Sequence, residues 1–264
     1  DADASKTKAL RIEAIHQIVA KYEPLENIET AVLIDIMISY RNSEAFSEMQ
    51  SFIKQLPRYV FETLMVQEQY AFVLNRNGGK GKPVDEMMIR EAESVLKKLE
   101  QDGKASSESY GIWGRIYKDK FERAYRAGSI AEARIYLEDA LSYYEKGFES
   151  DPRDAYPGVN FVTCLELLGE REKALRLLPA VEYAVNAKVK RKTPDYWDYV
   201  TLLELAVIEN RWPTAERYFY KAKPLAVEEW MLATTKENLS KILNFRKARN
   251  ENTIDLEKIV TLFG

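Results

Sequence analysis

The chain has 264 residues, of which 46% are hydrophobic and 31% charged, so it is long and apolar enough to bury a sizeable core. Its 42 acidic and 39 basic residues leave a net charge of -3, which favours neither a specific nucleic acid nor a membrane as the partner. One cysteine, Cys164, and one histidine, His16, exclude an internal disulfide framework and a Cys/His zinc site. We expect a cytoplasmic protein that needs no metal and no cofactor.

Helical periodicity runs through almost the whole chain, with apolar residues at i, i+3, i+4 and i+7 and no sustained strand alternation. The fold class is therefore predicted to be all-α. We expect one domain over residues 1–264, and because the chain starts at Asp1 without methionine we expect a fragment of a longer protein. In chain order the pattern predicts an N-terminal helix at 5–22, helix pairs at about 28–57, 58–101, 107–152, 155–187 and 195–223, and C-terminal helices at 227–263.

Evenly sized helices with short joints indicate a repeat, and residues 107–152 fit the tetratricopeptide pattern apart from the distance between their two helices. The pattern places small residues where two helices approach and aromatic residues between successive pairs. Gly114 and Ala140 occupy the two small positions but lie 26 residues apart, so about 14 extra residues must lengthen the helices or their turn. We therefore expect a tetratricopeptide-like α-solenoid of antiparallel helix pairs. The matching positions are Tyr110, Trp113, Gly114 and Tyr117, followed by Ala140, Tyr144, Gly147 and Pro152.

Six stretches occur in an order that is similar to one family. They are LIDIMISYR at 33–41, YAFVLNR at 70–76, GRIYKD at 114–119, YEKGFE at 144–149, YPGVN at 156–160 and YWD at 196–198. Together they resemble the TRAFs-binding domain in the central regulatory region of the apoptosis signal-regulating kinases, which belong to the MAP kinase kinase kinase class, and of bacterial relatives. The resemblance implies a helical regulatory and interaction module without catalysis of its own, and TRAF binding where the host has TRAF proteins. A kinase domain is excluded, since the glycine-rich loop, H-R-D and D-F-G motifs are all missing.

The candidate partner-binding residues follow from the repeat. In tetratricopeptide arrays the first helix of each pair lines a groove, with residues one, four and five places beyond the small position facing it. These positions predict a mixed acidic and basic groove that either recognises a protein partner or flanking domain, or holds neighbouring repeats in register. An ordinary i, i+4 ion pair between Arg115 and Asp119 is the plainer alternative. The candidates are Arg76, Arg115, Lys118, Asp119, Glu166 and Glu204, to which we add the aromatic Trp197.

Other motifs carry no chemistry that the sequence supports. Residues 78–83, GGKGKP, lack the spacing of a phosphate loop and are expected to form a flexible loop between helices, and the basic run KVKRK at 188–192 is expected to be a solvated linker. His16 and Cys164 have no catalytic partner, so we predict no catalytic residue. The favoured function is a non-catalytic regulatory scaffold of a signalling protein. The alternative is a helical accessory domain that senses a small ligand, with Trp113, Tyr156 and Trp197 as aromatic walls.

Overall fold

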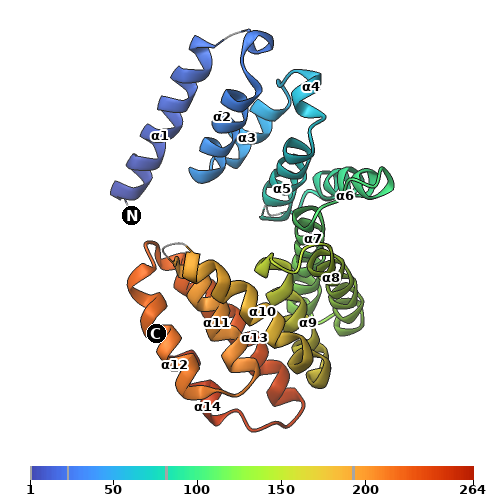
Figure 1. Cartoon of the computed structure of the whole chain (residues 1–264), viewed down its shortest axis with the longest axis vertical. Coiled ribbons are helices and arrows are strands. Elements are labelled where there is room, and N and C mark those ends of the chain that lie inside the picture. The colour runs from blue at the N-terminus through green and yellow to red at the C-terminus, as the bar shows by residue number, and fades with distance from the viewer. Residues whose placement is uncertain (1, 23, 81–82, 192–193) are drawn as a thin grey trace. The chain divides into compact units, whose positions relative to one another are not determined.

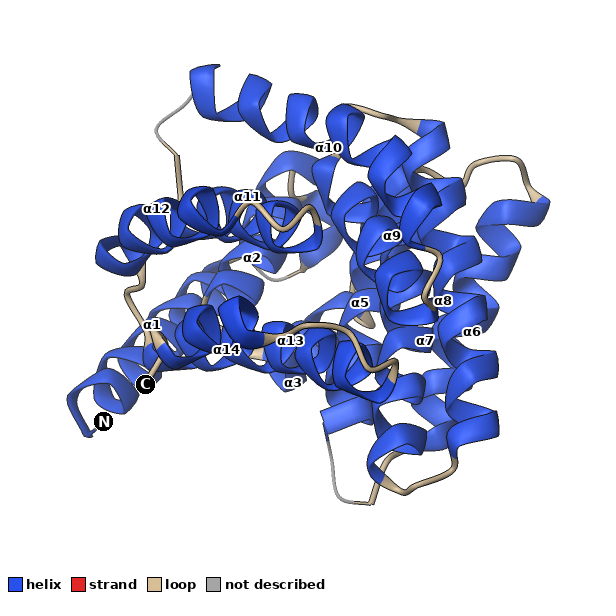
Figure 2. Ribbon diagram, turned by 90° about the horizontal axis from the view of Figure 1, so that it is seen from below, coloured by secondary structure: helices blue, strands red, loops and turns tan. Residues whose placement is uncertain are grey.

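The computed structural model describes residues 2–22, 24–80, 83–191 and 194–264, and every regular element in these ranges is a helix (Figures 1 and 2). The helices pack in successive pairs, which confirms the predicted all-α fold and agrees with an α-solenoid. None of the described helices combines the length and the apolar character that crossing a membrane requires. The chain divides into two compact units, residues 1–112 and 113–264, which are described separately below.

In its described residues, the N-terminal unit is built from six α-helices, one 3-10 helix and the start of a seventh α-helix. Its pairs form around α5, which packs on both α3 and α6. The start of α7 is held on α5, because the hydroxyls of Ser106 and Ser109 donate to the Glu68 carboxylate at 2.5 and 2.6 Å. The elements are α1 (Ala2–Lys21), η1 (Leu25–Asn27), α2 (Thr30–Asn42), α3 (Phe46–Ile53), α4 (Arg58–Phe61), α5 (Leu64–Lys80), α6 (Glu86–Gln101) and α7 (Ser107–Arg126).

The glycine-rich stretch after residue 77 differs from its prediction. Helix α5 continues through Gly78 and Gly79 to residue 80, so the expected loop is wrong for residues 78–80, and residues 81–82 lie outside the described ranges. A β-carbon at Gly78 would lie 2.8 Å from the β-carbon of Met88. Glycine is therefore used here for the close approach of α6 rather than for a turn.

The C-terminal unit continues the series of pairs from α7. The extra residues predicted between Gly114 and Ala140 lengthen α7 and α8 to 20 and 21 residues, while their turn stays short. Helix α10 extends to residue 191, so the basic run that we expected to be a linker is helical over 188–191, and residue 192 is not described. The further elements are α8 (Ile130–Ser150), α9 (Ala155–Leu168), α10 (Arg171–Arg191), α11 (Tyr196–Ile208), α12 (Trp212–Ala222), η2 (Lys223–Leu225), α13 (Glu229–Ala248) and α14 (Ile254–Thr261).

Packing of α7 on α8 follows the small-residue pattern read from the sequence. A β-carbon at Gly114 would lie 2.8 Å from the ring of Tyr144, which is fully buried. Next to it, the rings of Trp113 and Tyr143 stack with centroids 4.3 Å apart and planes at 14°. The aromatic residues of the GIWGRIY stretch therefore build the α7–α8 interface.

Helix α13 does not extend the series of pairs outward. It lies across α7, α9 and α11: Phe245 contacts the Phe121 ring of α7, α13 packs along α9, and the Tyr196 hydroxyl of α11 donates to the Met231 carbonyl at 3.0 Å. Leu239 and Ile242 of α13 are fully buried in the main core of this unit. The side of α9 that carries Glu166 and parts of α7 and α11 are thus packed against α13.

Candidate functional site

The predicted partner-binding residues fall in both units. Arg76 belongs to α5 of the N-terminal unit, where its guanidinium lies 5.1 Å from the centroid of the Phe72 ring. The others lie in the C-terminal unit, on the first helix of three successive pairs. These are Arg115, Lys118 and Asp119 on α7, Glu166 on α9, and Trp197 and Glu204 on α11.

Arg115 and Asp119 form the i, i+4 ion pair that the plainer alternative proposed, with Nε and Oδ1 2.9 Å apart. Burial opposes the charge of Arg115, but the Asp119 carboxylate together with Tyr156, Tyr144 and Glu122 outweighs burial and raises the pKa of the guanidinium. The ion pair is therefore contained within about one turn of α7.

Lys118 and Glu204 connect neighbouring pairs. The buried Lys118 ammonium donates to Asn160 Oδ1 on α9 at 2.9 Å, and the Thr163 hydroxyl on α9 donates to the Glu204 carboxylate on α11. Burial, reinforced by the positive charges of Arg115 and Lys241, lowers the pKa of Lys118. These bonds run between successive first helices, which is the arrangement needed to keep the pairs in register.

Several charged residues of this region were missed by the sequence reasoning. Lys241 Nζ on α13 lies 2.5 Å from Glu122 Oε1 on α7, and Arg126 Nη2 lies 2.5 Å from Glu237 Oε1. Burial opposes ionisation of Glu122, but Lys241 and Lys118 outweigh it and lower the pKa of this carboxyl. The repeat pattern marks Lys118, one turn before Glu122, but it carries no signal that α13 would return to α7.

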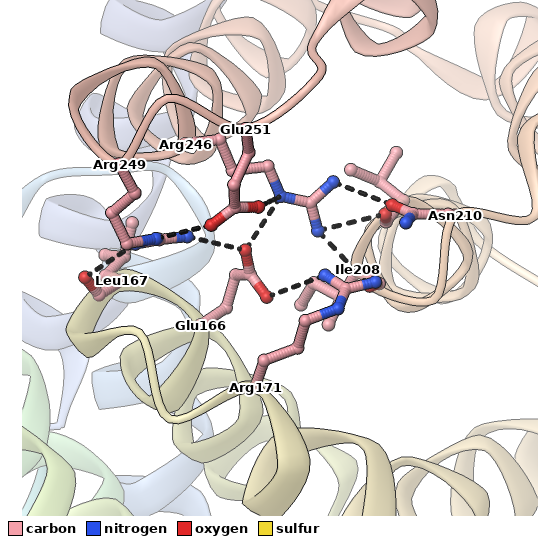
Figure 3. A network of polar contacts seen from close by, with 9 residues as sticks. Glu166, Leu167, Arg171, Ile208, Asn210, Arg246, Arg249 and Glu251 are labelled. Atoms are coloured by element: carbon pink, nitrogen blue, oxygen red, sulfur yellow. Dashed lines mark hydrogen bonds and ion pairs between the residues drawn. The ribbon is translucent and has the colours of Figure 1, made fainter.

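Glu166 is the centre of the most buried charge network (Figure 3). Its Oε1 accepts from Arg246 Nε at 2.8 Å and from Arg249 Nη2 at 3.1 Å, and its Oε2 accepts from Arg171 Nη1 at 3.4 Å. Arg246 also donates through Nη1 to Asn210 Oδ1 at 2.8 Å. Glu166 and Arg246 are each only 1% exposed. Both oxygens of the Glu166 carboxylate accept a hydrogen bond from an arginine. These are the contacts expected of a residue that holds neighbouring helices together.

Trp197 lies on the solvent side of this arrangement. It is 39% exposed in the first turn of α11, and its ring centroid is 5.8 Å from that of Trp230, which is 48% exposed in the first turn of α13. The neighbouring Tyr196 is buried, and its hydroxyl lies 2.7 Å from Thr235 Oγ1. The half-exposed indoles of Trp197 and Trp230 therefore lie side by side, next to the buried and hydrogen-bonded Tyr196.

The start of α11 is fixed by charge as well. Asp195 and Asp198 form a reciprocal capping box, and Lys188 Nζ of α10 lies 2.5 Å from Asp198 Oδ1. A capping box satisfies two backbone N–H groups at a helix start, which limits fraying of that turn. Trp197, the residue between these carboxylates in sequence, is consequently held in a well-defined position.

The small-ligand alternative assigned three aromatic residues to the walls of a ligand pocket, and the structure contradicts one of these assignments. Trp113 is 5% exposed and stacked on Tyr143, so the expectation that it would face a ligand is wrong. Cys164 is buried, and burial raises the pKa of its thiol to about 12. Within the described ranges, no cluster of three or more His, Cys, Asp or Glu side chains is arranged to hold a metal ion.

Fold and site together define a helical-repeat domain of the α-solenoid type, in which charged side chains join the helices and an aromatic pair faces solvent. The model of the MAP3K TRAFs-binding domain family matches residues 2–263, and the chain belongs to this family. The resemblance seen in the six sequence stretches is therefore confirmed.

The relatives are long signalling proteins. Mitogen-activated protein kinase kinase kinase nsy-1 of Caenorhabditis elegans is 29% identical over 240 residues, which cover 86% of this chain and 16% of that protein. Mitogen-activated protein kinase kinase kinase 15 of Mus musculus is 24% identical over 255 residues, covering 92% and 18%. Mitogen-activated protein kinase kinase kinase 5 of Homo sapiens is 23% identical over 256 residues, with the same coverage. The chain thus spans less than a fifth of the length of these relatives.

Proposed function

We propose that this chain is a non-catalytic regulatory module that binds a protein partner in the cytoplasm as part of a signalling protein. The observation that carries the proposal is the match of residues 2–263 to a family described as TRAFs-binding. TRAF proteins are accordingly the first partners to test, and a flanking domain of the same polypeptide is the second. The relatives named above are kinases, and the segment that matches this chain is the TRAFs-binding one.

Among the predicted partner-binding residues we assign direct contact to Trp197, together with Trp230. Tryptophan is among the residue types that contribute most to binding at protein interfaces, and rigid support lowers the entropic cost of binding. For Lys118, Glu166 and Glu204 we propose the second of the two roles considered above, which is to hold neighbouring repeats in register. Arg115 and Asp119 pair within α7, and the Arg76 guanidinium lies by the Phe72 ring of its own helix, so we assign none of these three a direct contact with the partner.

The test is a binding measurement between the purified chain and a panel of purified TRAF proteins by isothermal titration calorimetry. The double substitution Trp197→Ala with Trp230→Ala is expected to weaken binding by about tenfold or more, because truncation of a central interface residue commonly costs more than 1 kcal/mol. The matched control is Tyr183→Ala on α10, which removes a ring that is 77% exposed and is expected to leave the affinity unchanged.

Two results would contradict the proposal in different ways. If no TRAF protein binds the unsubstituted chain, TRAF recognition is wrong for it, and the same measurement with the flanking domains decides whether the module acts within its own polypeptide. If a TRAF protein binds but the tryptophan variant retains full affinity with an unchanged circular dichroism spectrum, the contact surface lies elsewhere.

A further inference from the structure

A pocket of about 450 Å³ opens in the C-terminal unit between α8 and α10, with α9 at its base. It is separate from the Trp197–Trp230 pair and uses none of the charged residues described above. Most of its lining is apolar, and the buried rings of Phe148 and Phe161 form part of it. Its size is in the range of pockets that hold a ligand or the anchoring side chains of a peptide. The apolar lining comprises Leu141, Phe148, Pro152, Phe161, Leu165 and Leu177.

The wall formed by α8 is acidic. Glu145 and Glu149 lie one turn apart on this helix, and both are exposed. No ion pair joins either carboxylate to another residue in the described part of the chain. Like charges at i and i+4 destabilise a helix by a few tenths of a kcal/mol, so this pair serves no evident purpose in the folding of α8.

The wall formed by α10 is basic. In the described part of the chain, Lys173 and Arg176 pair only with nearby carboxylates, Lys173 with Glu170 just before α10 at 3.1 Å and Arg176 with Glu172 on α10 at 3.8 Å. All four side chains are about half exposed or more, and such surface pairs contribute little and exchange readily. Both cations are thus free to pair with a ligand at low cost.

We propose that this pocket binds a short peptide segment of a protein partner, with one large apolar side chain in the pocket, a basic residue against Glu145 and Glu149, and an acidic residue against Lys173 and Arg176. The charge pattern supports this choice of ligand. A nucleic acid or an anionic membrane presents one sign of charge and would be repelled by the acidic wall. A peptide can present both signs on either side of an apolar residue.

This inference extends the proposed function, on which it rests only in taking a protein as the ligand. It assigns a second surface and a sequence preference that do not depend on TRAF proteins. If the chain binds no TRAF protein, the proposal of a peptide-binding pocket is not contradicted. If no peptide binds the pocket, the proposed role of the Trp197–Trp230 surface is not contradicted.

The experiment is selection of random 12-residue peptides by phage display on the intact chain, followed by fluorescence anisotropy with the enriched peptides. We expect enriched sequences in which a leucine, phenylalanine or methionine stands between a basic and an acidic residue. Leu141→Asp should weaken binding by about tenfold or more, because it places a charge in the apolar pocket. The matched control is Leu175→Asp on α10, which alters an exposed leucine outside the pocket and should leave affinity unchanged.

A charge exchange supplies a second test that does not disturb the core. The double substitution Glu145→Lys with Glu149→Lys should weaken binding about tenfold, and a peptide whose basic residue is replaced by glutamate should regain affinity on this variant. The proposal is overturned if no peptide is enriched, or if the enriched peptides bind the Leu141→Asp and lysine variants as tightly as the unsubstituted chain.

Discussion

Arg246 is one of the largest fully buried side chains of the described part of the chain, and it is charged. A buried ion pair adds little to stability compared with apolar residues of the same shape, but the loss of one partner leaves an uncompensated charge in the interior. Removal of the Glu166 carboxylate would therefore destabilise the chain mainly through the buried Arg246 charge that it leaves behind.

Substitution Glu166→Gln should lower the free energy of unfolding by about 3–5 kcal/mol, because the buried Arg246 then loses its nearest carboxylate and keeps only Glu251, 3.7 Å away, as a charged partner. Urea unfolding followed by circular dichroism measures this change. Glu170→Gln is the matched control, since its ion pair with Lys173 is on the surface, and it should change stability by less than about 0.5 kcal/mol. A cost for Glu166→Gln as small as that of the control would show that the network is not coupled to folding.

Cys164 offers a clean probe of burial because it is the only cysteine in the chain. The thiolate is the reactive form, and burial raises the pKa of this thiol to about 12. We expect almost no reaction of the native chain with a disulfide reagent at pH 8, and one reacted thiol per chain in 6 M guanidinium chloride, about the concentration that unfolds even hyperstable proteins. A variant that also carries Ser142→Cys, at an exposed position of α8, should show one fast-reacting thiol in the native state. Equal rates for the two thiols would contradict the buried placement.

Sequence reasoning succeeded at this scale where the partners are close in the chain. The Arg115–Asp119 pair follows from a spacing of four residues. Glu166 was identified by its position in the repeat, but its partner Arg246 is 80 residues away, and no local pattern connects the two. Trp197 was named as a candidate, whereas Trp230 was missed for the same reason.

At the scale of the helices, Gly114 decides how closely α7 and α8 approach. Glycine in the middle of a helix costs about 1 kcal/mol relative to alanine, so an ordinary helix would gain from the substitution. Here the space for a methyl group is taken by the ring of Tyr144, 2.8 Å from the position of a β-carbon. Close packing of α7 on α8 therefore favours glycine at position 114, whereas helix propensity favours alanine.

Substitution Gly114→Ala should destabilise the chain by about 1–3 kcal/mol in spite of its better helix propensity, because overpacking forces α7 or Tyr144 to shift. Thermal unfolding followed by circular dichroism measures it. In a background with Tyr144→Leu, the same substitution should cost less or become favourable, since the ring is gone. If the cost is the same in both backgrounds, the contact with Tyr144 is not its cause.

Helix positions were predicted well and helix ends less well. The repeat pattern predicted a close approach of α7 and α8 at Gly114, but it placed the aromatic residues between successive pairs, whereas the Tyr144 ring packs on Gly114 within the pair. The continuation of α5 through Gly78 and of α10 to residue 191 could not be read from composition, since glycine and lysine runs usually mark loops. At Gly78, the packing of α6 outweighs the local preference of glycine for a loop.

For the molecule as a whole, α13 and α14 determine whether α7, α9 and α11 present their charged residues to solvent. Removal of residues 227–264 would leave Glu166 with Arg171 as its only arginine and would uncover Phe121. We expect a fall in Tm of about 10 °C or more, since the loss of several kcal/mol shifts Tm by 2–4 °C per kcal/mol in a chain of this size. Binding of a dye specific for exposed apolar surface should increase.

The matched control removes residues 1–22 instead. Among its described side chains, α1 contributes only Ile15 to the buried apolar residues, so its loss should lower Tm much less. Equal effects of the two truncations would contradict the role given to α13.

The return of α13 also has a consequence for synthesis of the protein. Chains emerge from the ribosome N-terminus first and begin to fold as they emerge, so α7 to α12 pair while the helix that covers them has not yet been made. Lys241 reaches Glu122 across 119 residues of chain, and such distant contacts form late. During that interval the uncovered side of the nascent domain presents the Phe121 ring next to charged side chains such as Glu122 and Glu166. The carboxylates that later bind α13 thus keep part of this side solvated, while its apolar part stays exposed until α13 has been made.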